Sequence, residues 1–134
     1  MKYIKQFENF ETEDFNNSVS KELNIDKILD NYLEAAIWTS EEDLSKSYTI
    51  YDFDNVAKEN AKSDIINFVS KAKEFLTGIA EEQIGHDFWL TRNHHGAGFW
   101  DRGYDENIGN KLTEISHEFK ESTVVEDDGK LFLE

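Results

Sequence analysis

The sequence predicts an α+β fold, in which a small antiparallel sheet packs against about three amphipathic helices. Two observations lead to this prediction. Three segments carry apolar residues at intervals of three and four, which is typical of helices that bury one face. Two other segments, 86–102 and 122–133, combine short aromatic or apolar runs with turn-forming residues, which is typical of β-hairpins. Helices and hairpins in separate runs favour an antiparallel sheet with helices on one face.

The three predicted helices cover residues 24–38, 54–77 and 106–120. Asn24 and Asp54 precede the first two and suit the N-cap position, because a short polar side chain there can accept from a free backbone N–H. Gly78 follows the second helix, where a residue with positive φ is favoured. Residues 79–84 are expected to add one helical turn that ends at Gly85. The apolar stripe of the first helix is Ile25, Ile28, Leu29, Tyr32, Leu33, Ala36 and Ile37.

The first predicted hairpin has strands at 86–93 and 98–102, joined by a turn at 93–97. Side chains alternate between the two faces of a strand. With an even number of turn residues, one face would consist of Phe88, Leu90 and Phe99, and would pack on the helices. The other face would be polar and aromatic, formed by Asp87, Trp89, Thr91, Trp100 and Arg102. The second hairpin, 122–133, is predicted from the Asp128-Gly129 pair, since this dipeptide favours a tight two-residue turn.

Length and composition narrow the possible classes of protein. The 134 residues suit a single domain over 1–134. For 1–23 the sequence leaves two alternatives, a short strand or helix docked by its aromatic side chains, or a loosely ordered segment. The absence of cysteine excludes disulfides, thiolate metal sites and a cysteine nucleophile. The sequence lacks an apolar run of the roughly 20 residues that a membrane span needs, and its N-terminus does not resemble a signal peptide. We therefore expect a cytoplasmic protein without membrane contact.

The net charge of −15 arises from 29 acidic and 14 basic residues. Such an excess keeps a protein soluble, and it makes direct DNA binding unfavourable. It also leaves open that the protein is an acidic mimic of nucleic acid, which would inhibit a DNA-binding protein.

Residues 85–103 differ from the rest of the chain. This window holds both arginines, three of the four histidines, two of the three tryptophans and four of the seven glycines. Its own charges cancel, so the remainder of the chain carries the whole negative charge. Solubility alone does not explain a neutral aromatic island in an acidic protein. The window is therefore the predicted functional site.

Arginine forks bind phosphate or carboxylate groups, and tryptophan offers a stacking surface. The window thus predicts recognition of a partner protein or of a small anionic, nucleotide-like ligand. The alternative is a structural role, in which an Asp87–Arg102 ion pair and the tryptophans form a buried cluster. The candidate ligand-binding residues are Asp87, Trp89, Arg92, Asn93, His94, His95, Trp100, Asp101 and Arg102.

An enzyme is the second hypothesis. In a small hydrolase or metal-dependent enzyme, His86, Asp87 and His94 would carry the chemistry. The spacing of the histidines and aspartates, however, matches no metal motif with a known mechanism. We therefore expect no bound metal and no cofactor, and we rank a binding protein above an enzyme.

The window reads GHDFWLTRNHHGAGFWDRG, and it resembles the signature of a family of small uncharacterised proteins carried by tailed phages and mobile elements. Two further segments are similar to that family, YLEAAIWTS at 32–40 and GNKLTEI at 109–115. The chain departs from the pattern at His94, where glycine is expected. The resemblance implies a phage-encoded accessory protein in the cytoplasm of its host, and it implies no particular reaction.

Overall fold

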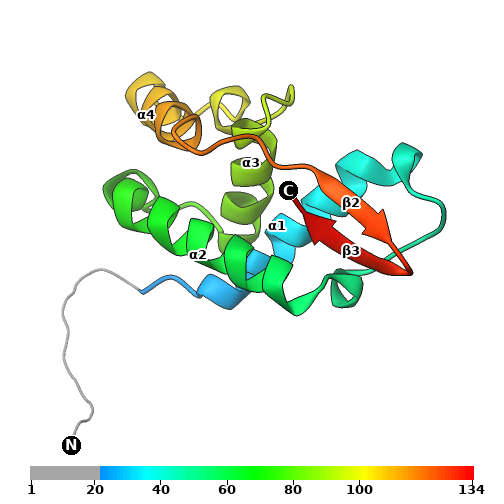
Figure 1. Cartoon of the computed structure of the whole chain (residues 1–134). Coiled ribbons are helices and arrows are strands. Elements are labelled where there is room, and N and C mark those ends of the chain that lie inside the picture. Colours follow the sequence, from blue (N-terminus) through cyan, green and yellow to red (C-terminus); the bar gives the residue numbers. More distant parts are fainter. Residues whose placement is uncertain (1–21) are drawn as a thin grey trace, which may run out of the picture.

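A computed structural model describes residues 22–134 (Figure 1). It has an α+β fold with a small sheet, as the sequence predicts. The two alternatives for 1–23 fall almost wholly on residues that lie outside this range. The helices are α1 (Ile25–Ser40), α2 (Asn55–Ala72), α3 (Glu81–Arg92) and α4 (Glu106–Ser116). Short 3₁₀ turns are η1 (Glu41–Asp43), η2 (Ile50–Asp52), η3 (Lys73–Phe75) and η4 (Phe99–Asp101), and the strands are β2 (Val124–Asp127) and β3 (Lys130–Leu133).

Helices α1, α2 and α4 occur where the apolar stripes predict them, and their first turns are capped by side chains. Asn24 accepts a hydrogen bond from the backbone N–H of Lys27, and Asp54 accepts one from that of Val56. Asp105 caps α4 in the same way. These caps occupy N–H groups that have no partner within the helix. Helix α4 ends at Ser116, four residues before the predicted end.

The prediction of a hairpin at 86–102 is wrong. Residues 81–92 form α3, and only the 3₁₀ turn η4 lies within 98–102. The prediction failed because α3 lies in the middle of the fold, between α1, α2, α4 and η4 (Figure 1). Eight of its twelve residues are buried, on all sides of the helix, so the sequence has no single apolar stripe there. Polar and apolar residues alternate by chance in 86–93, and this alternation led to the wrong prediction of a strand.

Phe88, Leu90 and Phe99 are buried in the core, as expected, although not as one face of a sheet. The ring of Phe68 from α2 stacks on Phe88 with centroids 4.2 Å apart, and on Phe99 with centroids 5.7 Å apart. The edge of Trp89 meets Tyr32 of α1 at 5.3 Å. Aromatic packing of this kind adds to the burial of apolar area. The core thus joins α1, α2, α3 and η4.

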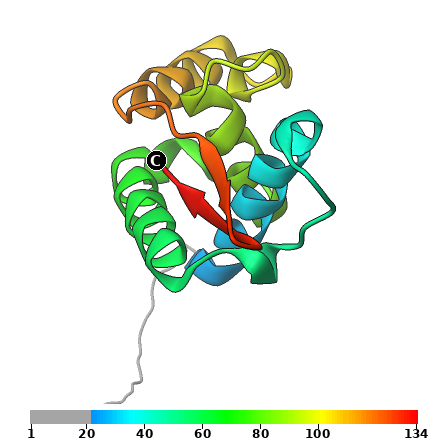
Figure 2. The ribbon, with the colours of Figure 1, turned by 45° about the vertical axis from the view of Figure 1, so that its right-hand side comes forward.

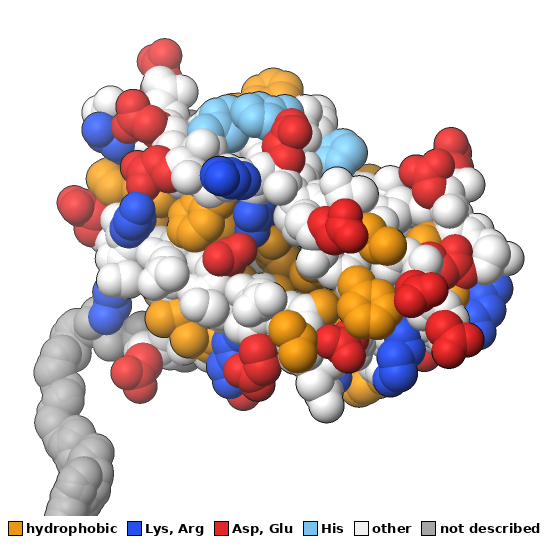
Figure 3. Space-filling view, viewed as in Figure 1, with side chains coloured by type: hydrophobic (Ala, Val, Ile, Leu, Met, Phe, Trp, Pro, Cys, Tyr) orange, Lys and Arg blue, Asp and Glu red, His pale blue; other side chains and the backbone are white. Residues whose placement is uncertain are grey.

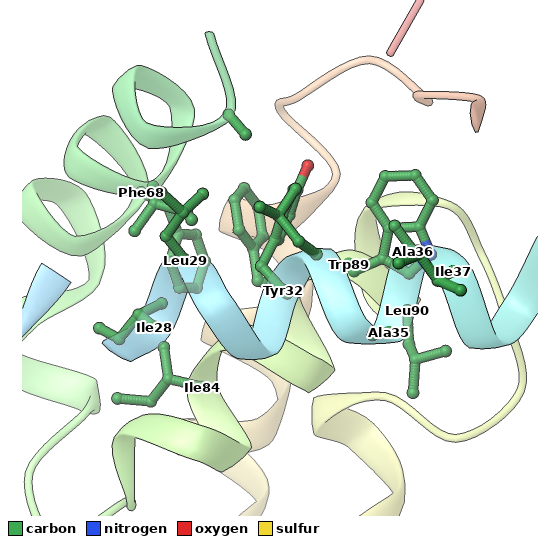
Figure 4. Close-up of a cluster of buried hydrophobic side chains, with 14 of the residues drawn as sticks. Ile28, Leu29, Tyr32, Ala35, Ala36, Ile37, Phe68, Ile84, Trp89 and Leu90 are labelled. Carbon is green, nitrogen blue, oxygen red and sulfur yellow. The ribbon is translucent and has the colours of Figure 1, made fainter. Parts of the chain in front are cut away.

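Helices α1 and α3 lie very close together (Figure 4). A Cβ atom on Gly85 would lie only 2.2 Å from the carbonyl oxygen of Ile28 and 2.9 Å from the backbone nitrogen of Tyr32. Glycine at position 85 therefore permits the approach of the two backbones. The sequence had suggested that Gly85 ends a helical turn, whereas it lies inside α3.

The second predicted hairpin is confirmed. Strands β2 and β3 pair antiparallel with Val124 opposite Leu133. Asp128 and Gly129 form the turn, with φ of 53° and 79°, the positive values that a tight Asp-Gly turn uses. The backbone N–H of Asp54 donates to the carbonyl of Leu131 at 2.9 Å, which joins β3 to the start of α2. The hairpin thus lies against α1 and α2 (Figure 2).

Candidate functional site

Asp87 and Arg102 form a tight ion pair that joins α3 to the segment after η4. The Arg102 guanidinium donates from Nη2 to Asp87 Oδ1 at 2.8 Å and from Nε to Oδ2 at 3.1 Å. The Asp87 side chain is fully buried, and that of Arg102 is 30% exposed. Hydrogen bonding to Asp87 raises the pKa of Arg102. Arg102 Nη2 also donates to the carbonyl of Ala97, at 3.1 Å. The predicted contact between the two side chains is present, but it joins a helix to a loop.

Arg92, the other arginine, is buried at a different place. Its Nη1 donates to the hydroxyl of Tyr32 at 2.9 Å and to the carboxylate of Asp64 at 2.8 Å, and its Nε donates to the carbonyl of Lys120 at 2.9 Å. Burial raises the pKa of Tyr32 to about 12, so its hydroxyl stays protonated at neutral pH. Arg92 therefore ties α3 to α1, α2 and the chain after α4, and its donors are already engaged.

Two further predicted residues have structural partners. Trp89 is buried, and its indole N–H donates to Thr39 Oγ1 at 2.9 Å. Asn93 ends α3, where its side chain donates to the carbonyl of Trp89 and accepts from the backbone N–H of Ser122 at 2.7 Å. Both side chains therefore fix α3 against its neighbours and present little surface to a ligand.

The remaining predicted residues are exposed but do not converge. The imidazole of His94 stacks on His117 at 4.2 Å, and in Figure 3 histidines gather at the top of the molecule. Trp100 is 54% exposed, so it does not pack beside the buried Trp89 as the hairpin required. His95 and Asp101 are exposed on the loop and on η4. The predicted site residues of 85–103 therefore lie at separate places in the structure and do not form one site.

His86 leads to a surface that the sequence did not single out. Its ring packs on the indole of Trp38 with centroids 5.7 Å apart, while its Nδ1 lies 3.7 Å from the Asp87 carboxylate. Trp38 is 58% exposed, and Tyr51 of η2 is 83% exposed. Both aromatic side chains line an open groove of about 990 Å³ between α1, η2 and the start of α3, which Arg102 also lines.

Trp38 lines a second hollow as well, of about 580 Å³, on the side of η1 and the loop that carries His95. We call the two hollows together the Trp38 surface. Five carboxylates line them: Glu34, Glu41, Glu42, Asp43 and Glu82. The lining contains one guanidinium, that of Arg102, and Asp87 already holds it. The Trp38 surface is therefore aromatic and strongly negative.

Only one feature of the sequence points to this surface. Trp38 follows the last apolar position of the first predicted helix. Periodicity alone does not distinguish an exposed tryptophan at a helix end from a buried one, because both continue the apolar pattern. Tyr51 and the carboxylates lie on four different elements, α1, η1, η2 and α3, so the fold alone brings them together.

The described residues show neither a metal site nor a membrane-spanning helix, and the chain matches no known protein in the comparisons below. Within residues 22–134, no three His, Asp or Glu side chains are grouped so as to hold a metal ion. Over the same residues, none of the helices has the length and apolarity needed to cross a membrane. Comparison of the chain with protein-family models, curated proteins and solved structures finds no match.

Proposed function

We propose that this protein is a binding protein that attaches to a partner protein through the Trp38 surface. The exposure of Trp38 and Tyr51 around an open groove carries the proposal. Single exposed apolar side chains are common on monomers, but two large aromatic rings at one groove are typical of an interaction site. Tryptophan and tyrosine are the residues that most often dominate the affinity of protein interfaces. Contact with His86 orients the Trp38 ring before any partner arrives, which lowers the entropic cost of binding.

The same contacts weigh against a small anionic ligand. The expected anion site depends on the two arginines, and the guanidinium donors of Arg92 are taken by Tyr32, Asp64 and a backbone carbonyl. Arg102 is held by Asp87 and lies among carboxylates, which would repel an anion. A partner protein is therefore the part of the expectation that the geometry favours. The resemblance to phage proteins further supports a host protein as that partner.

The hydrolase alternative has less support. It needs His86, Asp87 and His94 to act at one point. Both oxygens of Asp87 are occupied by Arg102, and the imidazole of His94 stacks on His117. His86 instead packs on Trp38, at the edge of the groove.

The proposal is tested by selecting random peptides that bind the intact chain. Selected peptides should bind wild type and lose roughly thirtyfold in affinity with Trp38→Ala, since truncation of an aromatic anchor costs about 2 kcal/mol or more. Trp100→Ala is the matched control, because Trp100 is equally exposed but does not line either hollow. Unchanged melting temperatures would show that both variants are folded. Peptides that bind equally well to Trp38→Ala, or a selection that enriches none, would contradict the proposal.

A further inference from the structure

The Trp38 surface combines two features that recognise the same chemical group. Trp38 and Tyr51 present aromatic rings to solvent, and the faces of such rings attract cations. The surrounding side chains supply negative charge from several directions, from α1 (Glu34), η1 (Glu41) and the first turn of α3 (Glu82). A guanidinium or ammonium group in the groove would gain from both features at once.

Nearby cations only partly neutralise these carboxylates. Lys27 lies 3.1 Å from Glu82 in an exposed ion pair, which water and salt weaken. Hydrogen bonding at its own backbone and to Lys27 lowers the pKa of Glu82, so its carboxylate is charged at neutral pH. Within residues 22–134, the carboxylates of Glu34 and Glu41 form no ion pair or side-chain hydrogen bond, and both residues are exposed. An incoming cation therefore meets available carboxylates.

The shape of the surface favours an extended segment over a single small cation. Trp38 stands between two open hollows of about 990 and 580 Å³, and carboxylates line both. A small-molecule site usually encloses its ligand, whereas these hollows are open along the surface. A peptide that crosses Trp38 could place a basic side chain in each.

We infer that the partner presents an arginine- or lysine-rich segment, which crosses Trp38 and places its cationic side chains among the carboxylates of the two hollows. This inference rests on the proposed function and specifies its partner. The overall charge of −15 would also attract such a segment from a distance. Recognition of the segment, however, requires the local arrangement of Trp38, Glu34 and Glu41.

Synthetic peptides of glycine and serine with three arginines test the inference against the intact chain. In the matched peptide, citrulline replaces each arginine and keeps its shape and most of its hydrogen-bond donors without the charge. We expect the arginine peptide to bind, with binding that weakens as salt increases, and the citrulline peptide to bind at least tenfold less tightly. Chemical shifts of backbone amides would show whether the contact lies at 34–51 and 82–102.

Charge variants of the protein locate the interaction. The double variant Glu34→Gln, Glu41→Gln should bind the arginine peptide less tightly than wild type, by roughly fivefold or more. Trp38→Ala should lower the affinity to a similar extent. Glu114→Gln on α4 removes one negative charge far from Trp38 in the sequence and outside the groove lining, and it should leave binding unchanged.

Three results would overturn the inference. The arginine peptide could fail to bind, it could bind Trp38→Ala as well as wild type, or citrulline could bind as tightly as arginine. If citrulline peptides, or neutral peptides from the random selection, bind in a manner that needs Trp38, the proposed function stands and only the basic nature of the partner is wrong. If even the random selection yields no peptide that depends on Trp38, the proposed function fails as well.

Discussion

Replacing Arg102 by methionine removes the guanidinium and keeps most of the volume of the side chain. The Asp87 carboxylate, which is fully buried, would then lose both of its short hydrogen bonds, at 2.8 and 3.1 Å. The His86 Nδ1 atom, 3.7 Å from Asp87 Oδ1, lies beyond hydrogen-bond distance and would not replace them. An uncompensated buried charge of this kind costs about 3–5 kcal/mol. Because Arg102 itself is 30% exposed, water can replace part of the lost contact, so we expect about 3 kcal/mol.

Urea unfolding of four proteins measures this cost: wild type, Arg102→Met, Asp87→Asn and the double variant. Each single variant should be destabilised, and the double variant should recover part of the loss because it buries no unpaired charge. The coupling free energy in such a cycle belongs to the pair alone. In a thermal melt, Arg102→Met should unfold roughly 10 °C or more below wild type.

A loss below about 1 kcal/mol for Arg102→Met, with no coupling to Asp87→Asn, would refute the reasoning, because it lies in the range of exposed ion pairs. Arg102 would then be free to serve a ligand, and the argument against an anionic ligand would lose one of its two supports. Circular dichroism of the native states is the control that both single variants retain their helices.

Two further predictions concern other parts of the fold. Gly85→Ala should lower the free energy of unfolding by about 3 kcal/mol or more, because the added Cβ meets the backbone of α1 at 2.2 Å. Gly96→Ala is the control, since a Cβ there meets nothing within 4 Å, and it should change the free energy of unfolding by less than about 0.5 kcal/mol. Equal effects of the two substitutions in urea unfolding would contradict the close packing of α1 and α3. Hydrogen bonds from Ser45 and Tyr48 lower the pKa of Glu126 below its ordinary 4.5, so the stability that it contributes is present above pH 4.5 and is lost as the pH falls through the lowered value. Between pH 6 and pH 3, the melting temperature of Glu126→Gln should therefore fall less than that of wild type. If the melting temperatures of the two proteins fall in parallel, the hydrogen bonds from Ser45 and Tyr48 to Glu126 do not stabilise the fold.

The sequence predicts those elements that bury one face. Helices α1, α2 and α4 have an apolar stripe and a capping residue, and the Asp128-Gly129 turn requires backbone angles that few other dipeptides adopt easily. Helix α3 has neither sign. From Asp87 to Arg92 all of its residues are buried, so it shows no single apolar stripe, and Ala80 at its start offers no side-chain cap. Its type therefore depends on contacts with the rest of the fold, which a local pattern does not contain.

The candidate site, like the fold, could be predicted from the sequence only in part. Concentration of arginine, tryptophan and glycine in 85–103 correctly marks an unusual segment, and the Asp87–Arg102 contact was expected. Its residue types suggest ligand binding, yet Asp87, Trp89 and Arg92 are buried. Exposed Trp38 and Tyr51, by contrast, look like ordinary aromatic residues of a helix end and a loop. Solvent exposure is a property of the assembled molecule, so the sequence alone does not distinguish the two cases.

The central position of α3 has a consequence for the evolution of this protein. Substitutions in 85–92 face the backbone of α1, the rings of α2 or a buried ion pair, so selection for folding alone is enough to restrict them. Trp38 and Tyr51 are largely exposed, and Trp38 packs mainly on His86, so folding restricts these two positions less. Under the proposed function, they are free to change when the partner changes. Two proteins that share the window would then share a scaffold without sharing a target. Divergence at Trp38 and Tyr51 is where a change of partner would be recorded.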